Sequence, residues 1–260
     1  MGRTQLQDAV PMTLGQEFEA YAYTLEENIE RLNAAAKLFL VENMGATAIG
    51  TGINSEPEYA EICARELRII SGEEFVLAPN LIAATPDTGA CVSYSSELKR
   101  FCVQLSKVCN DLRLLSSGPR CGLNEINLPM QPGSSIMPGK VNPVIPEVVN
   151  QVCFRVIGND TTVMMAAEAG QLELNVMEPV IVYAIFNSMQ MLIKVMDRLR
   201  VLCVDGITAN AERCKDMVMN SIGIVTALNP TLGYENSSRI AKRALAENRS
   251  VYDLVLEEKL

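Results

Sequence analysis

The sequence predicts an all-α protein, with a long central helical bundle followed by a small helical carboxy-terminal domain. Of its 260 residues, 48% are hydrophobic but only 5% are aromatic, which favours helix-on-helix packing over a β-sandwich. Apolar residues also recur at spacings of three and four over long segments. Both observations indicate helices long enough to build a bundle.

The first half of the chain contains three predicted helices. Apolar residues at helical spacing predict one long helix over residues 14–40. Gly50 to Gly52 then indicates a turn or a short hairpin. A shorter helix is predicted for residues 57–70, with Gly72 as its C-cap. The clearest pattern comes next, a 3-4-3-4-3 spacing typical of a bundle seam: Leu98, Phe101, Leu105, Val108, Leu112 and Leu115.

An irregular segment interrupts the helices between Pro119 and Pro143, where Gly, Pro, Ser and Asn accumulate. Loops of this length inside a helical chain are uncommon and often functional. Helical spacing returns over residues 144–156 and 189–203. After Asp205-Gly206 we expect shorter helices, at residues 210–220, 237–246 and 250–256. We therefore predict two domains, a central bundle over 1–205 that carries loop 119–143 and a small helical domain over 206–260.

Composition excludes several classes of function. The net charge of −9 opposes binding to a phosphate backbone, so no nucleic acid partner is expected. The chain has no histidine, which removes Ser-His-Asp, Cys-His and histidine-metal mechanisms from these residues alone. A base must then be Ser, Lys, Tyr, Cys or a carboxylate, or must come from another chain. We expect no cofactor and no metal site.

Location is predicted from the cysteines and from the apolar runs. None of the eight cysteines forms a C-x-x-C pair, and their scatter over apolar helical positions favours free thiols in a reducing cytoplasm. The amino terminus lacks a signal-peptide pattern. The longest apolar run, Val180 to Phe186, is far short of the roughly 20 residues that span a bilayer. We expect a cytoplasmic protein with no membrane partner.

The irregular loop ends in G-S-S-I-M-P-G-K-V-N-P at residues 133–143, which combines two hydroxyls, an ammonium and an amide. Pro143 is expected to open a helix at its first turn, where free backbone N–H groups favour an anion beside Lys140 and Asn142. Composition alone leaves an ordinary connector with a solvated lysine equally open.

The order of residues decides between these two interpretations, because the segment closely resembles the signature of the fumarase/aspartase superfamily. Similar matches occur at G-R-T-Q-L-Q-D-A, residues 2–9, and at N-S-I-G, residues 220–223. The resemblance implies a long helical bundle, a homotetramer, active sites shared between subunits and a lyase that forms fumarate. Within the superfamily, residues 116–129 and 168–172 resemble the aspartase form. The expected activity is that of a carbon-nitrogen lyase, the reversible deamination of L-aspartate to fumarate and ammonia.

The resemblance also implies roles for individual residues. Ser134 would remove a β-proton from the dicarboxylate substrate, giving an enediolate. Substrate-binding roles fall on Thr4, Gln5, Ser135, Lys140 and Asn142. Gln5 departs from members that carry His there, so Glu147 would at most orient Gln5 by a hydrogen bond. An equally open interpretation of Glu147 is a first-turn acidic residue favoured by the helix dipole.

Two alternatives to this function remain. One is a fumarate hydratase or another lyase of the same superfamily, acting for example on malate. The other is a non-catalytic helical oligomerisation fragment. Superfamily members normally begin well before the G-R-T segment and extend past the last residue here, so we expect the amino-terminal domain to be absent, the carboxy-terminal domain to be truncated and the isolated chain to have little activity.

Overall fold

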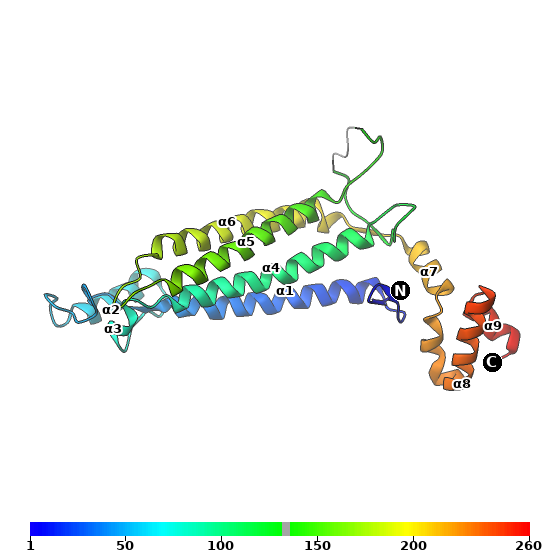
Figure 1. Cartoon of the computed structure of the whole chain (residues 1–260), viewed down its shortest axis with the longest axis horizontal. Helices are drawn as coiled ribbons and strands as arrows, with labels where there is room; N and C mark the ends of the chain where they lie inside the picture. The colour runs from blue at the N-terminus through cyan, green and yellow to red at the C-terminus, as the bar shows by residue number, and fades with distance from the viewer. Residues whose placement is uncertain (132–135) are drawn as a thin grey trace. The chain divides into compact units, whose positions relative to one another are not determined.

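The computed structural model describes residues 1–131 and 136–260, and in them the chain is predominantly helical (Figure 1). The helices are α1 (Leu14–Ala36), α2 (Tyr59–Ser71), α3 (Leu81–Ala84), α4 (Gly89–Leu115), α5 (Val144–Glu168), α6 (Glu178–Leu202), α7 (Ala211–Asn220), α8 (Ile224–Glu247) and α9 (Val251–Glu258), with short 3-10 helices η1 (Lys37–Leu40) and η2 (Val204–Gly206). The predicted fold class is confirmed. The helix that we expected Pro143 to open begins one residue later, at Val144.

Strands in the described residues are short pairs of two residues each. The antiparallel pairs are β1 (Arg3–Thr4) with β2 (Gln7–Asp8) and β5 (Ile126–Asn127) with β6 (Thr208–Ala209), and β3 (Val41–Glu42) lies parallel to β4 (Val76–Leu77). Two residues are too few to show alternation, so the sequence did not predict them. The expected turn is found close by, since residues 47–49 form a turn and residues 50 and 51 a bend. The nearest strand, β3, runs parallel to β4, so the two strands do not form a hairpin.

Contacts divide the chain into two compact units. One comprises residues 23–110 and 144–203, and the other comprises residues 1–22, 111–143 and 204–260. This division falls just after the end of α6, close to the predicted boundary at 206. It also groups residues 1–22 and 111–143 of the predicted bundle domain with the carboxy-terminal segment. The assignment of 1–205 and 206–260 as domains stays a prediction.

The first unit is a bundle of long helices (Figure 1). Buried polar contacts join neighbouring helices of the bundle. Asn28 of α1 donates to Gln104 of α4 at 2.6 Å. Asn150 of α5 donates to Ser106 of α4 at 2.8 Å, and Asn159 of α5 donates to Ser188 of α6 at 2.9 Å. Each buried amide can reach its hydrogen-bond partner only when the two helices are aligned in one way along their axes. These contacts therefore favour a single register of the helices. The predicted seam is buried here: Leu98, Phe101, Leu105 and Val108.

Helix α6 has the length and apolar composition of a membrane-spanning helix. The same properties are found in the core helices of soluble bundles. Here α6 packs along α5, and Ile181, Leu192 and Val195 on its inner face are buried. The uninterrupted apolar run in the sequence, Val180 to Phe186, is shorter than this helix because Asn187 and Ser188 end it. Ser188 forms the contact with Asn159.

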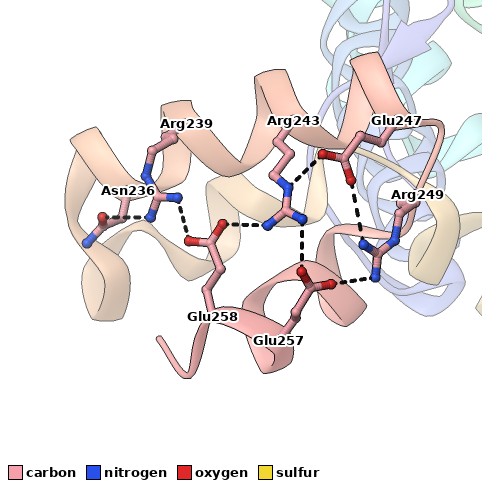
Figure 2. Close-up of polar contacts among 7 residues, drawn as sticks. All are labelled: Asn236, Arg239, Arg243, Glu247, Arg249, Glu257 and Glu258. Carbon is pink, nitrogen blue, oxygen red and sulfur yellow. Dashed lines mark hydrogen bonds and ion pairs between the residues drawn. The ribbon is translucent and has the colours of Figure 1, made fainter.

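The second unit contains a helical pair, α8 and α9, built around Val225, Ile240 and Leu254. Helix α8 is longer than the segment 237–246 predicted from sequence and bends at Gly233, whose φ of 76° is not helical. A network of arginines and glutamates joins the two helices on one side (Figure 2). Arg243 alone contacts three carboxylates, those of Glu247, Glu257 and Glu258, at 2.8 to 2.9 Å.

Candidate active site

Thr4 and Gln5 lie at the tip of a small hairpin formed by β1 and β2. Thr4 pairs with Gln7, and Gln5 and Leu6 form the two-residue turn between them. Both turn residues have positive φ, 55° and 61°, as a type I′ turn requires. The base of the hairpin is closed by backbone hydrogen bonds between Gly2 and the segment Ala9–Val10, each 2.9 Å long. The hairpin thus presents exposed Thr4 and Gln5 side chains at its end.

The first strand of the hairpin is anchored by an ion pair. The Arg3 guanidinium contacts the carboxylate of Glu125, and the Glu125 side chain is only 5% exposed. A buried carboxylate requires such a partner, because an unpaired charge in this position would be costly. Arg3 also contacts the sulfur of Met217 at 3.4 Å. No local pattern in the sequence predicts this pair, although each member lies in a segment that resembles the superfamily.

Glu125 belongs to a hydrogen-bonded cluster that also holds the first half of loop 119–143. Its carbonyl oxygen accepts from the backbone N–H of Asn210 at 2.8 Å and from the Cys214 thiol at 3.6 Å. Burial, followed by the nearby Glu125 charge, raises the pKa of Cys214, so the thiol stays protonated as this contact requires. The Asn210 side chain contacts Asn124 and Asn127. This half of the loop is therefore ordered by the segment that precedes α7.

The second half of the loop is more open. Residues 136–139 turn so that the backbone N–H of Lys140 donates to Met137 at 3.1 Å, and Gly139 takes a φ of 79°. The Lys140 side chain is exposed and Asn142 is half-buried. Among the described residues no carboxylate forms an ion pair with Lys140, which leaves its ammonium available to an anion. Ser134 and Ser135 lie outside the described residues.

Helix α5 begins at Val144, directly after the loop, and carries Glu147 in its first turn. The first N–H groups of a helix lack partners within it, so this end favours negative charge. Glu147 is half-buried. It belongs to the bundle unit, whereas Gln5 belongs to the other unit, and a contact between them stays a prediction.

The structure therefore joins the candidate residues in two groups. Thr4 and Gln5 share one turn, and Lys140 and Asn142 share the end of one loop. Both groups contain exposed polar side chains, one with a cation, which is what the recognition of a small dicarboxylate requires.

Comparison with known proteins identifies the family. A family model described as Lyase matches residues 1–158, and one described as Fumarase C C-terminus matches residues 224–260. The chain belongs to this lyase family. The Lyase model covers the hairpin, the whole of loop 119–143 and Glu147.

Individual relatives match along the whole length of the chain. It is 63% identical to an aspartate ammonia-lyase of Helicobacter pylori and 64% identical to one of Pseudomonas aeruginosa, in each case over 100% of the chain. A solved structure of a fumarate lyase:delta crystallin protein from Brucella melitensis superposes with a TM-score of 0.95 at 58% identity over 100% of the chain. The chain spans about half the length of these relatives, 56% of the Helicobacter protein, 55% of the Pseudomonas protein and 56% of the Brucella chain.

Proposed function

We propose that this chain forms part of an aspartate ammonia-lyase, which converts L-aspartate reversibly into fumarate and ammonia. The observation that carries the proposal is the identity of 63% to such an enzyme along the entire chain, including the hairpin and the loop that hold the candidate residues. Exposed Lys140, close before the amino end of α5, supplies positive charge where a carboxylate would bind.

In the proposed reaction, deprotonated Ser134 takes a proton from the β-carbon of L-aspartate. The electron pair left on carbon spreads into the adjacent carboxylate, giving an enediolate with two negative charges. That pair then forms the carbon-carbon double bond of fumarate, while the pair of the carbon-nitrogen bond leaves with ammonia. Ser134 must lose its new proton before the next turnover. The demanding step is enediolate formation, because it concentrates charge that fixed donors must stabilise.

We assign that stabilisation to Lys140 and Asn142, and substrate binding to Thr4, Gln5 and Ser135. The assignment of Lys140 is supported by its exposed side chain, which has no carboxylate partner among the described residues. Glu147 would orient Gln5. Without histidine in the chain, no His–Glu pair operates among these residues.

We further propose that the protein is a homotetramer with active sites shared between subunits. Large apolar side chains on the long helices face outward, among them Phe154, Tyr183, Phe186 and Ile193, which are 57% to 66% exposed. Exposed apolar side chains are typical of surfaces at which subunits associate, so these residues support the proposal. Sedimentation of the full-length enzyme should give the mass of four subunits.

A cytoplasmic location is proposed from the cysteines. All eight are free thiols, and four of them, Cys102, Cys109, Cys153 and Cys203, are buried. Free thiols persist in a reducing compartment.

The activity is tested with a chimaera in which this chain replaces the matching segment of the Helicobacter pylori relative. We expect fumarate formation from L-aspartate, none with Ser134→Ala, and normal assembly in both proteins. Turnover of L-malate but not of L-aspartate would favour a fumarate hydratase. Assembly without turnover, with the unmodified Helicobacter enzyme active in parallel, would favour the oligomerisation fragment. The 260-residue chain alone is expected to show little activity, and turnover at the rate of the chimaera would contradict that expectation.

A further inference from the structure

We propose that Asp8 and Ser221 are positioning residues that hold the tip of the β1–β2 hairpin, with Thr4 and Gln5, in its substrate-binding geometry. The inference rests on the proposed role of Thr4 and Gln5. It gives the N-S-I-G segment, residues 220–223, a function that the reaction itself does not require.

The contact between the two residues is direct. The Ser221 hydroxyl donates to the Asp8 carboxylate at 2.6 Å and accepts from the backbone N–H of Gly223 at 3.0 Å. Ser221, at the end of α7, is 4% exposed, whereas Asp8 is exposed on the second hairpin strand. A hydrogen bond to a carboxylate is stronger than one between neutral groups. The single hydroxyl thus connects the hairpin to the turn after α7.

Gly223 lets the hairpin approach this turn closely. A Cβ atom at Gly223 would lie 2.5 Å from the carbonyl oxygen of Ala9, which is backbone and cannot swing away as a side chain can. The φ of Gly223 is −59°, a value that any residue adopts. Its glycine is therefore required for space and not for backbone conformation. Ser221 thus contacts the second strand of the hairpin, and Gly223 lies against Ala9, the residue that follows this strand.

The hairpin needs outside support because its turn is strained. Gln5 and Leu6 both adopt positive φ, although neither is Gly, Asn or Asp. Such residues persist where their surroundings fix them. Arg3 and Asp8 are cross-strand partners in the hairpin. The ion pair of Arg3 with Glu125 therefore anchors one strand, and the hydrogen bond of Asp8 with Ser221 anchors the other strand at the same position. Release of the Asp8 side would let the tip move, and Thr4 and Gln5 would lose their alignment with the substrate.

The first test uses the active chimaera. We expect Ser221→Ala and Asp8→Ala each to raise KM for L-aspartate about tenfold, the usual effect of losing a hydrogen bond to a charged group, with kcat changed far less. The double variant should match the single ones, because both remove the same bond. The control is Ser237→Ala, since Ser237 is also buried in this unit but its hydroxyl lacks a hydrogen-bond partner among the described residues. Its KM should not change.

A second measurement separates this proposal from the proposed function. In the 260-residue chain, Ser221→Ala should speed hydrogen exchange of the amides in segment 2–10, and Ser237→Ala should not. Should the chimaera be inactive, the proposed function fails, and exchange alone decides whether the hairpin is held by Ser221. If Ser221→Ala unfolds the chain, Asp8→Ala at its exposed position replaces it. Unchanged KM with unchanged exchange, or a fall in kcat at constant KM, would overturn the proposal.

Discussion

The Lys99 ammonium on α4 lies 2.6 Å from the Asp160 carboxylate on α5, inside the helical bundle. Asp160 is 7% exposed and also accepts a hydrogen bond from Ser95 of α4 at 2.8 Å. Both partners come from one helix and are four residues apart, so they hold the carboxylate between consecutive turns of α4. This contact is therefore specific for one register of α4 against α5.

Asp160→Ala should lower the free energy of unfolding by about 2 to 3 kcal/mol, because it leaves the Ser95 hydroxyl and the partly buried Lys99 without their acceptor. Urea denaturation of the 260-residue chain measures the change. Asp197→Ala is the matched control, since Asp197 forms an exposed pair with Arg200 at 3.4 Å. Its effect should stay below about 0.5 kcal/mol. Equal effects of the two variants would show that burial of Asp160 does not matter.

Gly50→Ala should destabilise the chain more than Gly72→Ala. Both glycines have positive φ, 89° and 75°, so each substitution introduces backbone strain of about 1 to 2 kcal/mol. A Cβ at Gly50 would in addition lie 2.3 Å from the Cα of Ile82, whereas the space around Gly72 is open. We expect at least about 1 kcal/mol of further loss at Gly50 in urea denaturation. Similar losses at both positions would mean that the contact with α3 yields without cost.

Much of the helical architecture was predictable because apolar side chains repeat with the period of a helix. The predicted seam from Leu98 to Val108 is buried, and Gly72 is the C-cap of α2, with its N–H bonded to Arg68. The amino-terminal extension of α4 back to Gly89 was missed. Its first residues carry mixed side chains without a clear apolar stripe, so the seam pattern began too late.

The site was predictable only where a motif named the residues. Thr4, Gln5, Lys140 and Asn142 came from segments that resemble the superfamily, and the structure adds that the first two share a strained turn. The residues that hold that turn, such as Glu125 and Ser221, are far from it in sequence. No local periodicity connects Arg3 with Glu125 or Asp8 with Ser221. Such long-range pairs become visible only when the fold brings them together.

The Arg243 network should make the carboxy-terminal helical pair sensitive to acid (Figure 2). Hydrogen bonds from arginines lower the pKa of both carboxyls. The largest effect on Glu257 comes from Arg243, and the largest effect on Glu258 comes from Arg239. A carboxyl with a lowered folded pKa stabilises the fold above its unfolded value and loses that contribution as pH falls through the folded value. After correction for the intrinsic exchange rate, which itself slows as the pH falls, protection of the amides in α9 should therefore decrease as the pH falls below the ordinary glutamate pKa of about 4.3. Arg243→Met should weaken this loss of protection.

The control for the network is Arg31→Met, which removes an exposed pair with Glu27 at 3.3 Å in the other unit. It should leave exchange in α9 unchanged at every pH. Added salt should mimic Arg243→Met in the native chain at neutral pH, because these charges are partly exposed and are screened by ions. Protection of α9 against exchange that does not respond to pH in the native chain would show that the apolar contacts of Val251 and Leu254 hold the pair alone.

Lys140→Met in the active chimaera should lower kcat/KM for L-aspartate about a hundredfold or more, the usual loss when a group that stabilises developing charge is removed. Methionine keeps the length of the side chain and removes only the ammonium. Lys242→Met is the control, because Lys242 is also exposed but lies on α8. It should change kcat/KM less than about twofold, in line with a surface substitution. If Lys140→Met raised KM alone with kcat intact, the ammonium would bind the substrate carboxylate without stabilising the enediolate, and Asn142 with the loop N–H groups would have to carry that charge.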